Sequence, residues 1–228
     1  MREIVMDTET TGFDPSAGDR IVEIGCVELF NHMPTGKTYH QYINPERDMP
    51  EGAFSVHGLS AEFLSDKPVF AAIAQDFLDF CGDSKLVIHN ASFDMKFLNA
   101  EFKWMNKPQL PYSQAIDTLE IARKKFPGAQ NSLDALCRRF GITTERELHG
   151  ALLDSEILAE VYLELIGGRQ PDFVLSVVSN NADGGGDVDW MAPKRASALP
   201  SRLTDLEKEA HEAFVEKLGA DAVWKHIK

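Results

Sequence analysis

Positive charge is scarce in this chain. Its 228 residues include 23 Lys and Arg against 36 Asp and Glu, which gives a formal net charge of −13 at pH 7. Proteins that hold nucleic acid by a broad basic surface need clustered Lys and Arg, so the composition argues against that class. It does not exclude a nuclease whose bound cations neutralise the active site locally. Such an enzyme would grip a long polyanion weakly and would need a partner to hold its substrate.

Long apolar runs and paired cysteines are missing as well. No apolar run approaches the roughly 20 residues that span a bilayer, and the first residues do not have the layout of a signal peptide. The three cysteines, Cys26, Cys81 and Cys137, are odd in number and far apart in the sequence. We therefore expect buried thiols in a reducing cytoplasm and no contact with a membrane.

Apolar patterns predict alternating elements over the first three quarters of the chain. Residues 1–30 indicate two strands, and 37–43 a third strand after a turn at 31–36, which favours an antiparallel meander. Later patterns predict a helix over 69–81, a short buried strand over 85–88, and helices over 93–102, 133–140 and 152–166. Strands followed by alternating helices and strands predict an α/β fold, a mixed sheet flanked by helices.

The composition changes after Gly168. Residues 179–187 are small, polar and acidic, as in a flexible linker. Apolar residues then recur from Leu203 to Leu218 at the spacing of one amphipathic helix. A single helix cannot bury its own apolar face, so we expect it to dock on a partner. The predicted parts are a domain at 1–168, a linker at 169–199 and a helical tail at 200–228.

Two acidic residues end the first predicted strand. Asp7 and Glu9 follow the apolar run 4–6, and side chains at i and i+2 of a strand point to the same face. Two close carboxylates repel each other unless a cation lies between them. Mg²⁺ prefers oxygen ligands and keeps substrate phosphates in its shell. The pair therefore predicts a metal site that acts on phosphate, with a solvated strand end as the alternative.

Two more acids and a histidine could join this site. Asp94 follows the strand 85–88 at a strand-to-helix junction, where open α/β sheets bind ligands; the alternative is an acid stabilised by the helix dipole. Asp154 lies near the start of the last helix, and His149 precedes it by five residues, about 140° off the same helix face. Both reach one site only if His149 lies on the loop and Asp154 on the helix.

Three ordered motifs resemble the DEDDh superfamily of 3′–5′ exonucleases. They are Asp7-Thr-Glu-Thr-Thr-Gly12, His89-Asn-Ala-Ser-Phe-Asp94 and His149-Gly-Ala-Leu-Leu-Asp154. Between Asp117 and Leu165 the chain is most similar to the family of proofreading (epsilon) subunits of bacterial DNA polymerase III. The resemblance covers about residues 2–168 and is weak in the tail.

The resemblance implies a ribonuclease-H-like fold and phosphodiester hydrolysis with two divalent cations, Mg²⁺ or Mn²⁺. Asp7 would bridge both ions. Glu9 and Asp154 would complete the first metal site, and Asp94 would hold the second ion. His149 would be the general base that takes a proton from the attacking water, and the unperturbed pKa of a histidine, about 6.5, suits that role near neutral pH. The product would be a nucleoside monophosphate released from a DNA 3′ end.

The resemblance also implies contacts to the 3′-terminal nucleotide. Besides Asp7, Glu9 and Asp154, the expected substrate-binding residues are Thr10, Gly12, Gly52, His57 and Phe93. The backbone near Thr10 and Gly12 would line the sugar site, and Gly52 would offer a main-chain contact. His57 and Phe93 would flank the last base and sugar.

Several neighbouring residues have plainer interpretations. His89 and Asn90 are expected to fix the loop before Asp94. Asp117 has two equally supported interpretations: it makes a hydrogen bond at the end of a strand, or it supports the metal ligands. Lys124 and Lys125 are expected in solvent, with a phosphate contact as the alternative.

The resemblance implies partners for the tail. Residues 170–175 lie where the family carries a weak sliding-clamp-binding peptide, with an ordinary linker start as the alternative. Residues 200–228 resemble in position the segment that binds the DNA polymerase III alpha subunit. The implied function is proofreading in a cytoplasmic, bacterial-type replisome, where mismatched primer ends fray into a single-strand site. The alternatives are an RNA-trimming exonuclease of the same superfamily and a non-catalytic adaptor between clamp and polymerase.

Overall fold

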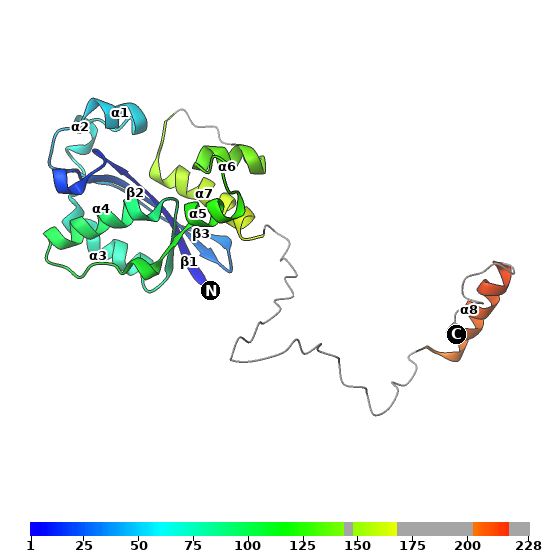
Figure 1. Cartoon of the computed structure of the whole chain (residues 1–228). Helices are drawn as coiled ribbons and strands as arrows, with labels where there is room; N and C mark the ends of the chain where they lie inside the picture. The colour runs from blue at the N-terminus through cyan, green and yellow to red at the C-terminus, as the bar shows by residue number, and fades with distance from the viewer. Residues whose placement is uncertain (144–147, 168–202, 219–228) are drawn as a thin grey trace, which may run out of the picture. The chain divides into compact units, whose positions relative to one another are not determined.

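A five-stranded mixed sheet organises the larger part of the chain (Figure 1). The computed structural model describes residues 1–143, 148–167 and 203–218, and the chain divides into two units, 1–175 and 176–228. The strand order is β3-β2-β1-β4-β5, and the strands are β1 (Arg2–Thr10), β2 (Ile21–Phe30), β3 (Met33–Tyr42), β4 (Lys85–Ile88) and β5 (Ala115–Asp117). The first three strands form the expected antiparallel meander, and β4 and β5 continue the sheet in parallel with β1.

The turn between β2 and β3 is shorter than the sequence indicated. The turn expected over 31–36 consists of Asn31 and His32 alone, and β3 begins directly after them. Both residues have positive φ, 51° and 66°, as in the two-residue turns that match the twist of paired strands. Pro34 and Gly36 suggested a longer turn. Here they lie within β3, which is an edge strand, and edge strands tolerate both residues.

Helices cover both faces of this sheet. The helices are α1 (Glu51–His57), α2 (Ala61–Leu64), α3 (Phe70–Cys81), α4 (Ala91–Trp104), α5 (Thr118–Lys125), α6 (Leu133–Phe140) and α7 (Ala151–Leu165). Figure 1 shows α3 and α4 on one side of the sheet and α5, α6 and α7 on the other. The α/β architecture and the helices expected over 69–81, 93–102, 133–140 and 152–166 are confirmed. Helices α1, α2 and α5 and strand β5 have no counterpart among the predicted elements.

Alternation along β1 assigns its side chains to the two faces. Ile4 and Met6 join the larger core cluster, which packs under α3 and α4. Val5 joins a second cluster, which packs under α7. Asp7 and Glu9 lie two and four residues after Val5, so their side chains point to the same face of the sheet as Val5, the face that α7 covers.

Cys26, Cys81 and Cys137 are all buried, as expected. Within the described ranges, no helix combines the length and the hydrophobicity that a membrane crossing requires.

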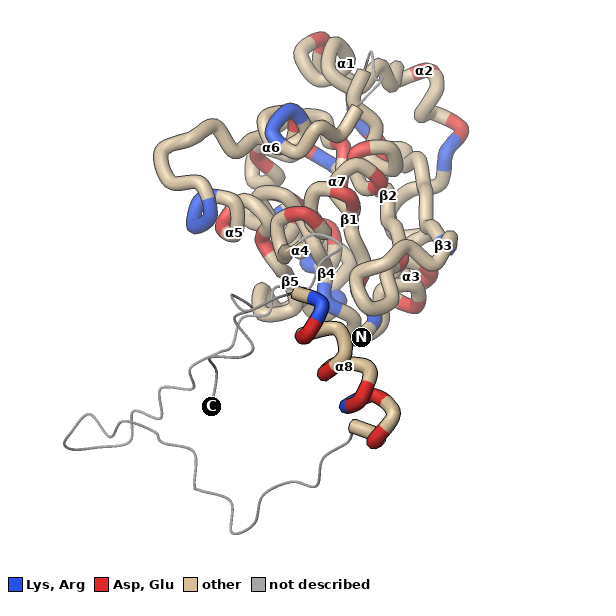
Figure 2. Tube along the Cα trace, turned by 90° about the vertical axis from the view of Figure 1, so that its right-hand side faces the viewer, with Lys and Arg blue, Asp and Glu red and all other residues tan. Residues whose placement is uncertain are grey.

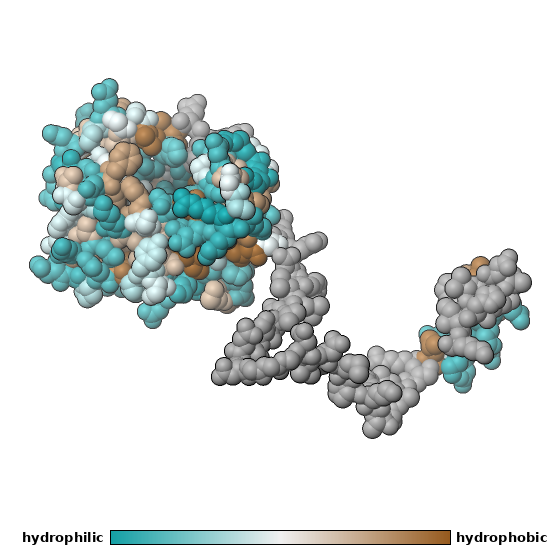
Figure 3. All heavy atoms as spheres, viewed as in Figure 1, coloured by the Kyte–Doolittle hydropathy of each residue, from teal (hydrophilic) through white to brown (hydrophobic). Residues whose placement is uncertain are grey.

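The second unit is described over one helix, α8 (Asp205–Lys217). Thr204 caps it by accepting a hydrogen bond from the Glu207 backbone N–H, and the Thr204 backbone N–H donates to the Glu207 carboxylate, which completes a capping box. The expected tail helix is therefore present. Its large apolar side chains are exposed (Figure 3): Leu203, Leu206, Phe214 and Leu218. The expected linker at 169–199, the peptide at 170–175 and the remaining tail residues, 200–202 and 219–228, lie outside the described residues.

Candidate active site

A polar cavity of about 260 Å³ opens at the ends of the parallel strands β1 and β4. Open α/β sheets bind ligands at the carboxyl ends of such strands. The cavity lining includes all the expected metal ligands and the expected base, namely Asp7, Glu9, Asp94, His149 and Asp154. They come from β1, from α4, from the start of α7 and from the loop before it. The fold thus brings together five side chains that span most of the domain sequence.

His149 and Asp154 lie as their spacing required. His149 is on the loop before α7, and Asp154 is in the first turn of that helix. The His149 Nδ1 atom is 3.0 Å from Oδ2 of Asp154. The Asp154 side chain is buried, whereas that of His149 is 45% exposed. A proton on Nδ1 that is donated to the carboxylate leaves the lone pair on Nε2, where the ring can accept a second proton.

The donor atoms of this cavity suit a hard divalent cation. Glu9, His149 and Asp154 each offer one ligand atom, and the three atoms lie within 4.8 Å of one another. Asp7 and Asp94 add two more carboxylates to the same lining. Oxygen-rich sets of this kind favour Mg²⁺ or Mn²⁺ over metals that prefer sulfur. The residues present therefore fit the metal site that the sequence predicts.

Asp94 reaches the cavity from the other face of the sheet. It lies in the first turn of α4 and is 2% exposed. Burial raises the pKa of Asp94 to about 7, although the Thr8 hydroxyl, which donates to Oδ1 at 2.7 Å, favours the carboxylate. A bound cation would favour the charged form in turn. Thr8 is a supporting residue that the motifs did not reveal. Its only signal in the sequence is its place between Asp7 and Glu9.

A second cavity of about 540 Å³ adjoins the first, and both are lined by Thr8, Glu9 and Phe93. Its lining contains every other expected substrate-binding residue, namely Thr10, Gly12, Gly52 and His57. Much of the remaining wall is apolar and comes from Pro50, Ala53 and Val56. A concave, largely apolar wall with a few polar groups is typical of small-ligand sites.

His57 is the last residue of α1 and is buried against this cavity. Its Nδ1 atom accepts a hydrogen bond from the Leu59 backbone N–H at 3.0 Å, so the ring proton is on Nε2. Burial lowers the pKa of His57. The ring is therefore a neutral hydrogen-bond donor near pH 7.

The loop that carries His149 rests on the end of α1. The His149 backbone N–H donates to the carbonyl of Val56 at 3.1 Å. Gly58 follows α1 with φ of 72°, and a Cβ at Gly58 would lie 2.6 Å from Cδ1 of Leu148. The segment that lines the second cavity thus supports the candidate base of the first.

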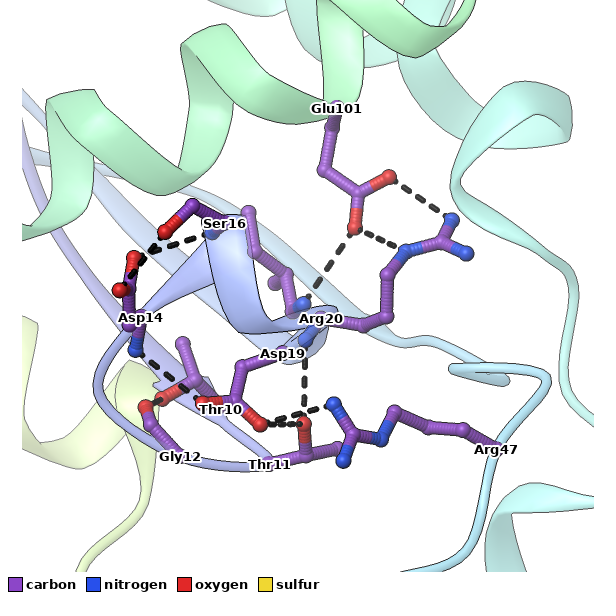
Figure 4. Close-up of polar contacts among 10 residues, drawn as sticks. Thr10, Thr11, Gly12, Asp14, Ser16, Asp19, Arg20, Arg47 and Glu101 are labelled. Atoms are coloured by element: carbon purple, nitrogen blue, oxygen red, sulfur yellow. Dashed lines mark hydrogen bonds and ion pairs between the residues drawn. The ribbon is translucent and has the colours of Figure 1, made fainter.

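The loop after β1 is held by a network around Asp19 (Figure 4). The Asp19 carboxylate accepts hydrogen bonds from the Thr11 hydroxyl, the Asp14 backbone N–H and the Arg47 guanidinium. A Cβ at Gly12 would lie 2.3 Å from the Asp19 Oδ2 atom. Gly12 is therefore needed as glycine for the shape of the loop, which keeps the backbone of residues 10–12 at the second cavity.

Gly25 in β2 lets α7 approach the sheet. A Cβ at this position would lie 2.2 Å from the backbone of Ala151 and Leu152, and the Ser155 hydroxyl donates to the Gly25 carbonyl at 2.9 Å. Gly25 pairs with Asp7 across the strands, so this close approach sets α7 beside the first acidic motif. A glycine inside an apolar strand is the sequence signal for such an approach.

The loop before Asp94 is fixed by Asp117. Its carboxylate accepts hydrogen bonds from the backbone N–H groups of Asn90, Ala91 and Leu119, and it caps α5. The strand-end interpretation of Asp117 therefore fits, and through this loop it also steadies the start of α4. His89 is equally tied down, because its Nδ1 atom lies 2.9 Å from the Thr118 hydroxyl.

Known proteins share this fold and much of this sequence. Residues 4–162 match the family model RNase_T, described as exonuclease. A DNA polymerase III subunit epsilon from Rickettsia felis is 56% identical over 188 residues, 79% of this chain and 82% of the relative. The subunit of that name from Escherichia coli is 42% identical over 98% of this chain and 97% of its own.

Solved structures of exonucleases have a similar fold. Exonuclease X in complex with 5′-overhanging duplex DNA superposes with a TM-score of 0.57 at 26% identity, over 72% of this chain and 90% of that one. The nuclease domain of 3′hExo, a DEDDh family member bound to rAMP, gives a TM-score of 0.64 at 20% identity, over 72% of this chain and 91% of that one. The second likeness concerns the fold alone.

Proposed function

This chain belongs to the exonuclease family whose model spans residues 4–162, and we propose that it is the 3′–5′ exonuclease that proofreads DNA replication as a subunit of DNA polymerase III. The observation that carries this proposal is the convergence of four carboxylates and one imidazole in a single cavity beside a second cavity of about 540 Å³. The first cavity offers the chemistry and the second offers the recognition of a terminal residue.

The family membership implies divalent metal ions, and the finer assignment is our proposal. Two ions, Mg²⁺ or Mn²⁺, would share Asp7. Glu9 and Asp154 would complete the first metal site, and Asp94 would hold the second ion. When bound, such ions acidify the attacking water and stabilise charge on the leaving 3′-oxygen.

His149 acts as the general base in this proposal. Asp154 accepts the Nδ1 proton at 3.0 Å and so orients the ring with its lone pair on Nε2. The exposure of the His149 side chain lets the proton taken from the attacking water pass on to solvent.

The terminal nucleoside occupies the second cavity. The backbone at Thr10 and Gly12 lines the sugar, and Gly52 adds a main-chain contact. Neutral His57 donates a hydrogen bond from Nε2, and Phe93, which both cavities share, stacks beside the last sugar and base. A mismatched primer end melts into this site at lower cost than a paired end, which favours removal of errors.

The acidic chain works beside a partner that holds the DNA. With a net charge of −13, it would bind a long polyanion weakly by itself. Residues 200–228, which include the exposed apolar side chains of α8, would dock on the polymerase alpha subunit, and residues 170–175 would bind the sliding clamp weakly. The protein would then act in the cytoplasm at the replisome.

The deciding experiment is digestion of a primer with a mispaired 3′ end, with and without a chelator. We expect stepwise release of nucleoside monophosphates that EDTA abolishes and Mn²⁺ or Mg²⁺ restores. Asp7→Ala should remove this activity and leave binding to the polymerase subunit intact. Faster digestion of a matched RNA oligonucleotide than of DNA would favour an RNA-trimming enzyme, and undiminished polymerase binding with no hydrolysis by wild type would favour an adaptor.

A further inference from the structure

A third cavity, of about 570 Å³, lies on the other side of the metal site. It shares His89, Asn90 and Ser132 with the first cavity, whereas the second cavity shares Thr8, Glu9 and Phe93 with it. The first cavity therefore lies between the other two. A strand whose 3′-terminal nucleoside fills the second cavity, with the scissile phosphate in the first, has the third cavity beside its preceding nucleotide.

Arg123 on α5 is the cationic side chain of this third cavity. Its lining also includes Leu119, Gly128, Ala129 and Asn131. Within the ranges that the structure describes, the Arg123 guanidinium makes no hydrogen bond or ion pair. It is nevertheless near the first cavity, because His89, which lines the third cavity with Arg123, also lines the first. Burial lowers the pKa of His89, and the positive charge of Arg123 lowers it as well. An arginine that lines a polar cavity without a protein partner can bind an external anion.

Neighbouring cations are engaged in the fold instead. Lys125 donates to the carbonyls of Glu164 and Leu165 at the end of α7. Arg139 lies 4.4 Å over the ring of Phe126, and it donates to the Gln130 carbonyl. Arg123 therefore differs from Lys125 and Arg139 in having no such contact among the described residues, and it differs from Lys124 and Arg138 in lining the cavity.

Helices α5 and α6 form a helical hairpin, residues 118–140, whose charge differs from that of the whole chain. These residues contain five Lys and Arg and two acids, Glu120 and Asp134. Figure 2 shows Lys and Arg on α5 and α6. A locally basic hairpin next to the metal site, in a chain of net charge −13, is the electrostatic footprint expected where a polyanion leaves the site.

We propose that Arg123 and the third cavity bind a backbone phosphate of single-stranded DNA upstream of the scissile bond. The proposal rests on the proposed function, because it requires the 3′ end to lie in the second cavity. A guanidinium presents a fixed fork of donors that matches two phosphate oxygens. Arg123 would then fix the path of the strand and resist its slippage between successive cuts, without taking part in the hydrolysis.

The test measures the hydrolysis of two kinds of substrate by three enzymes, namely the wild type, Arg123→Ala and Arg123→Lys. One is the p-nitrophenyl ester of thymidine 5′-monophosphate, which has a scissile phosphate and no upstream phosphate. The other is a series of single-stranded oligonucleotides from two to ten residues. We expect Arg123→Ala to raise KM for the longer oligonucleotides about tenfold, with kcat within twofold of wild type and ester hydrolysis unchanged. Arg123→Lys should recover part of the loss, since it keeps the charge but not the fork.

Salt dependence gives an independent readout. Loss of one phosphate contact to a single strand should make the plot of log kcat/KM against log salt shallower by about 0.7. Lys124→Ala is the matched control, because it removes one charge from the same exposed helix at a residue that does not line the cavity.

Three results would overturn the assignment. They are an equal loss on the ester and the oligonucleotides, an unchanged KM for every length, and an identical effect of Lys124→Ala, which would indicate diffuse charge alone. Failure of the proposed function would look different, since wild type itself would then hydrolyse neither substrate.

Discussion

Substitution of Gly25 by alanine should damage catalysis from a position that touches no substrate. The added Cβ would lie 2.2 Å from the Ala151 and Leu152 backbone, where ordinary contacts begin near 3.4 Å. Backbone atoms cannot turn aside as a side chain can. The first turn of α7 must therefore retreat from β2 by more than 1 Å, and Asp154 retreats with it.

The size of the effect follows from this displacement. A misplacement of about 1 Å in a catalytic constellation can cost about 100-fold in rate. Overpacking of a well-packed core costs typically about 1–3 kcal/mol of stability. We therefore expect kcat for Gly25→Ala to fall about 100-fold, and the metal concentration needed for half-maximal rate to rise, because Asp154 and His149 move away from Asp7 and Glu9.

The assay is steady-state 3′ digestion of an oligonucleotide at saturating metal, well below the melting temperature of each variant. Ile73→Val provides the control, because Ile73 lies in the core cluster on the opposite face and its truncation should cost about 0.5–1.5 kcal/mol without moving α7. A folded Gly25→Ala enzyme with kcat within twofold of wild type would show that the close approach of α7 to β2 does not set the site.

Three further perturbations test the supports of the site. Gly58→Ala forces an alanine to φ of 72° and places its Cβ against Leu148. We therefore expect kcat to fall about tenfold with little change in KM. A change in KM alone would show that the contact between α1 and the His149 loop does not support the base. Thr8→Val removes the hydroxyl that favours the charged form of Asp94, so the acidic limb of the kcat–pH profile should move to higher pH. If this limb does not move, Thr8 does not influence the ionisation of Asp94. The raised pKa of Asp94, about 7, means that the metal-free folded protein binds a proton that the unfolded chain, with an ordinary pKa of 3.8, has lost. Its stability should therefore fall by up to about 1.4 kcal/mol per pH unit between pH 4 and pH 7 and then level off; Mg²⁺ should raise the melting temperature more at pH 8 than at pH 6, and Asp94→Asn should flatten both trends.

The fold was predictable wherever one periodicity dominated. The apolar run 4–6 predicts a strand, and β1 is buried there on both faces. The helical spacing of 69–81 and 133–140 predicts helices with one buried face, and these helices formed as expected. Helix α1 was missed because its residues are mostly exposed, so no apolar stripe marks it. The β2–β3 turn was misplaced because Pro34 and Gly36 usually interrupt strands, and only the position of β3 at the sheet edge makes them acceptable.

Some residues of the candidate site could likewise be predicted from the sequence, and others could not. Acids and a histidine at motif spacing could be found from residue type alone, and the structure gathers them in one cavity. Supports such as Thr8, Gly25 and Asp19 act through contacts with residues distant in sequence or through the space they leave open. The chemistry of Thr8 and Asp19 is ordinary, so no pattern in a single sequence singles them out, whereas Gly25 has the signal of a glycine inside an apolar strand.

The acidic residues of the site belong to both layers of helices. Asp154 is carried by α7 on one face of the sheet, and Asp94 by α4 on the other, while Asp7 and Glu9 end the strand between them. A nascent chain that has docked only one layer would lack part of the ion-binding set, and α7 is the last helix of the domain to emerge during synthesis. Immature or half-unfolded copies would therefore be harmless to primers, and nuclease activity would report that the whole domain has been assembled.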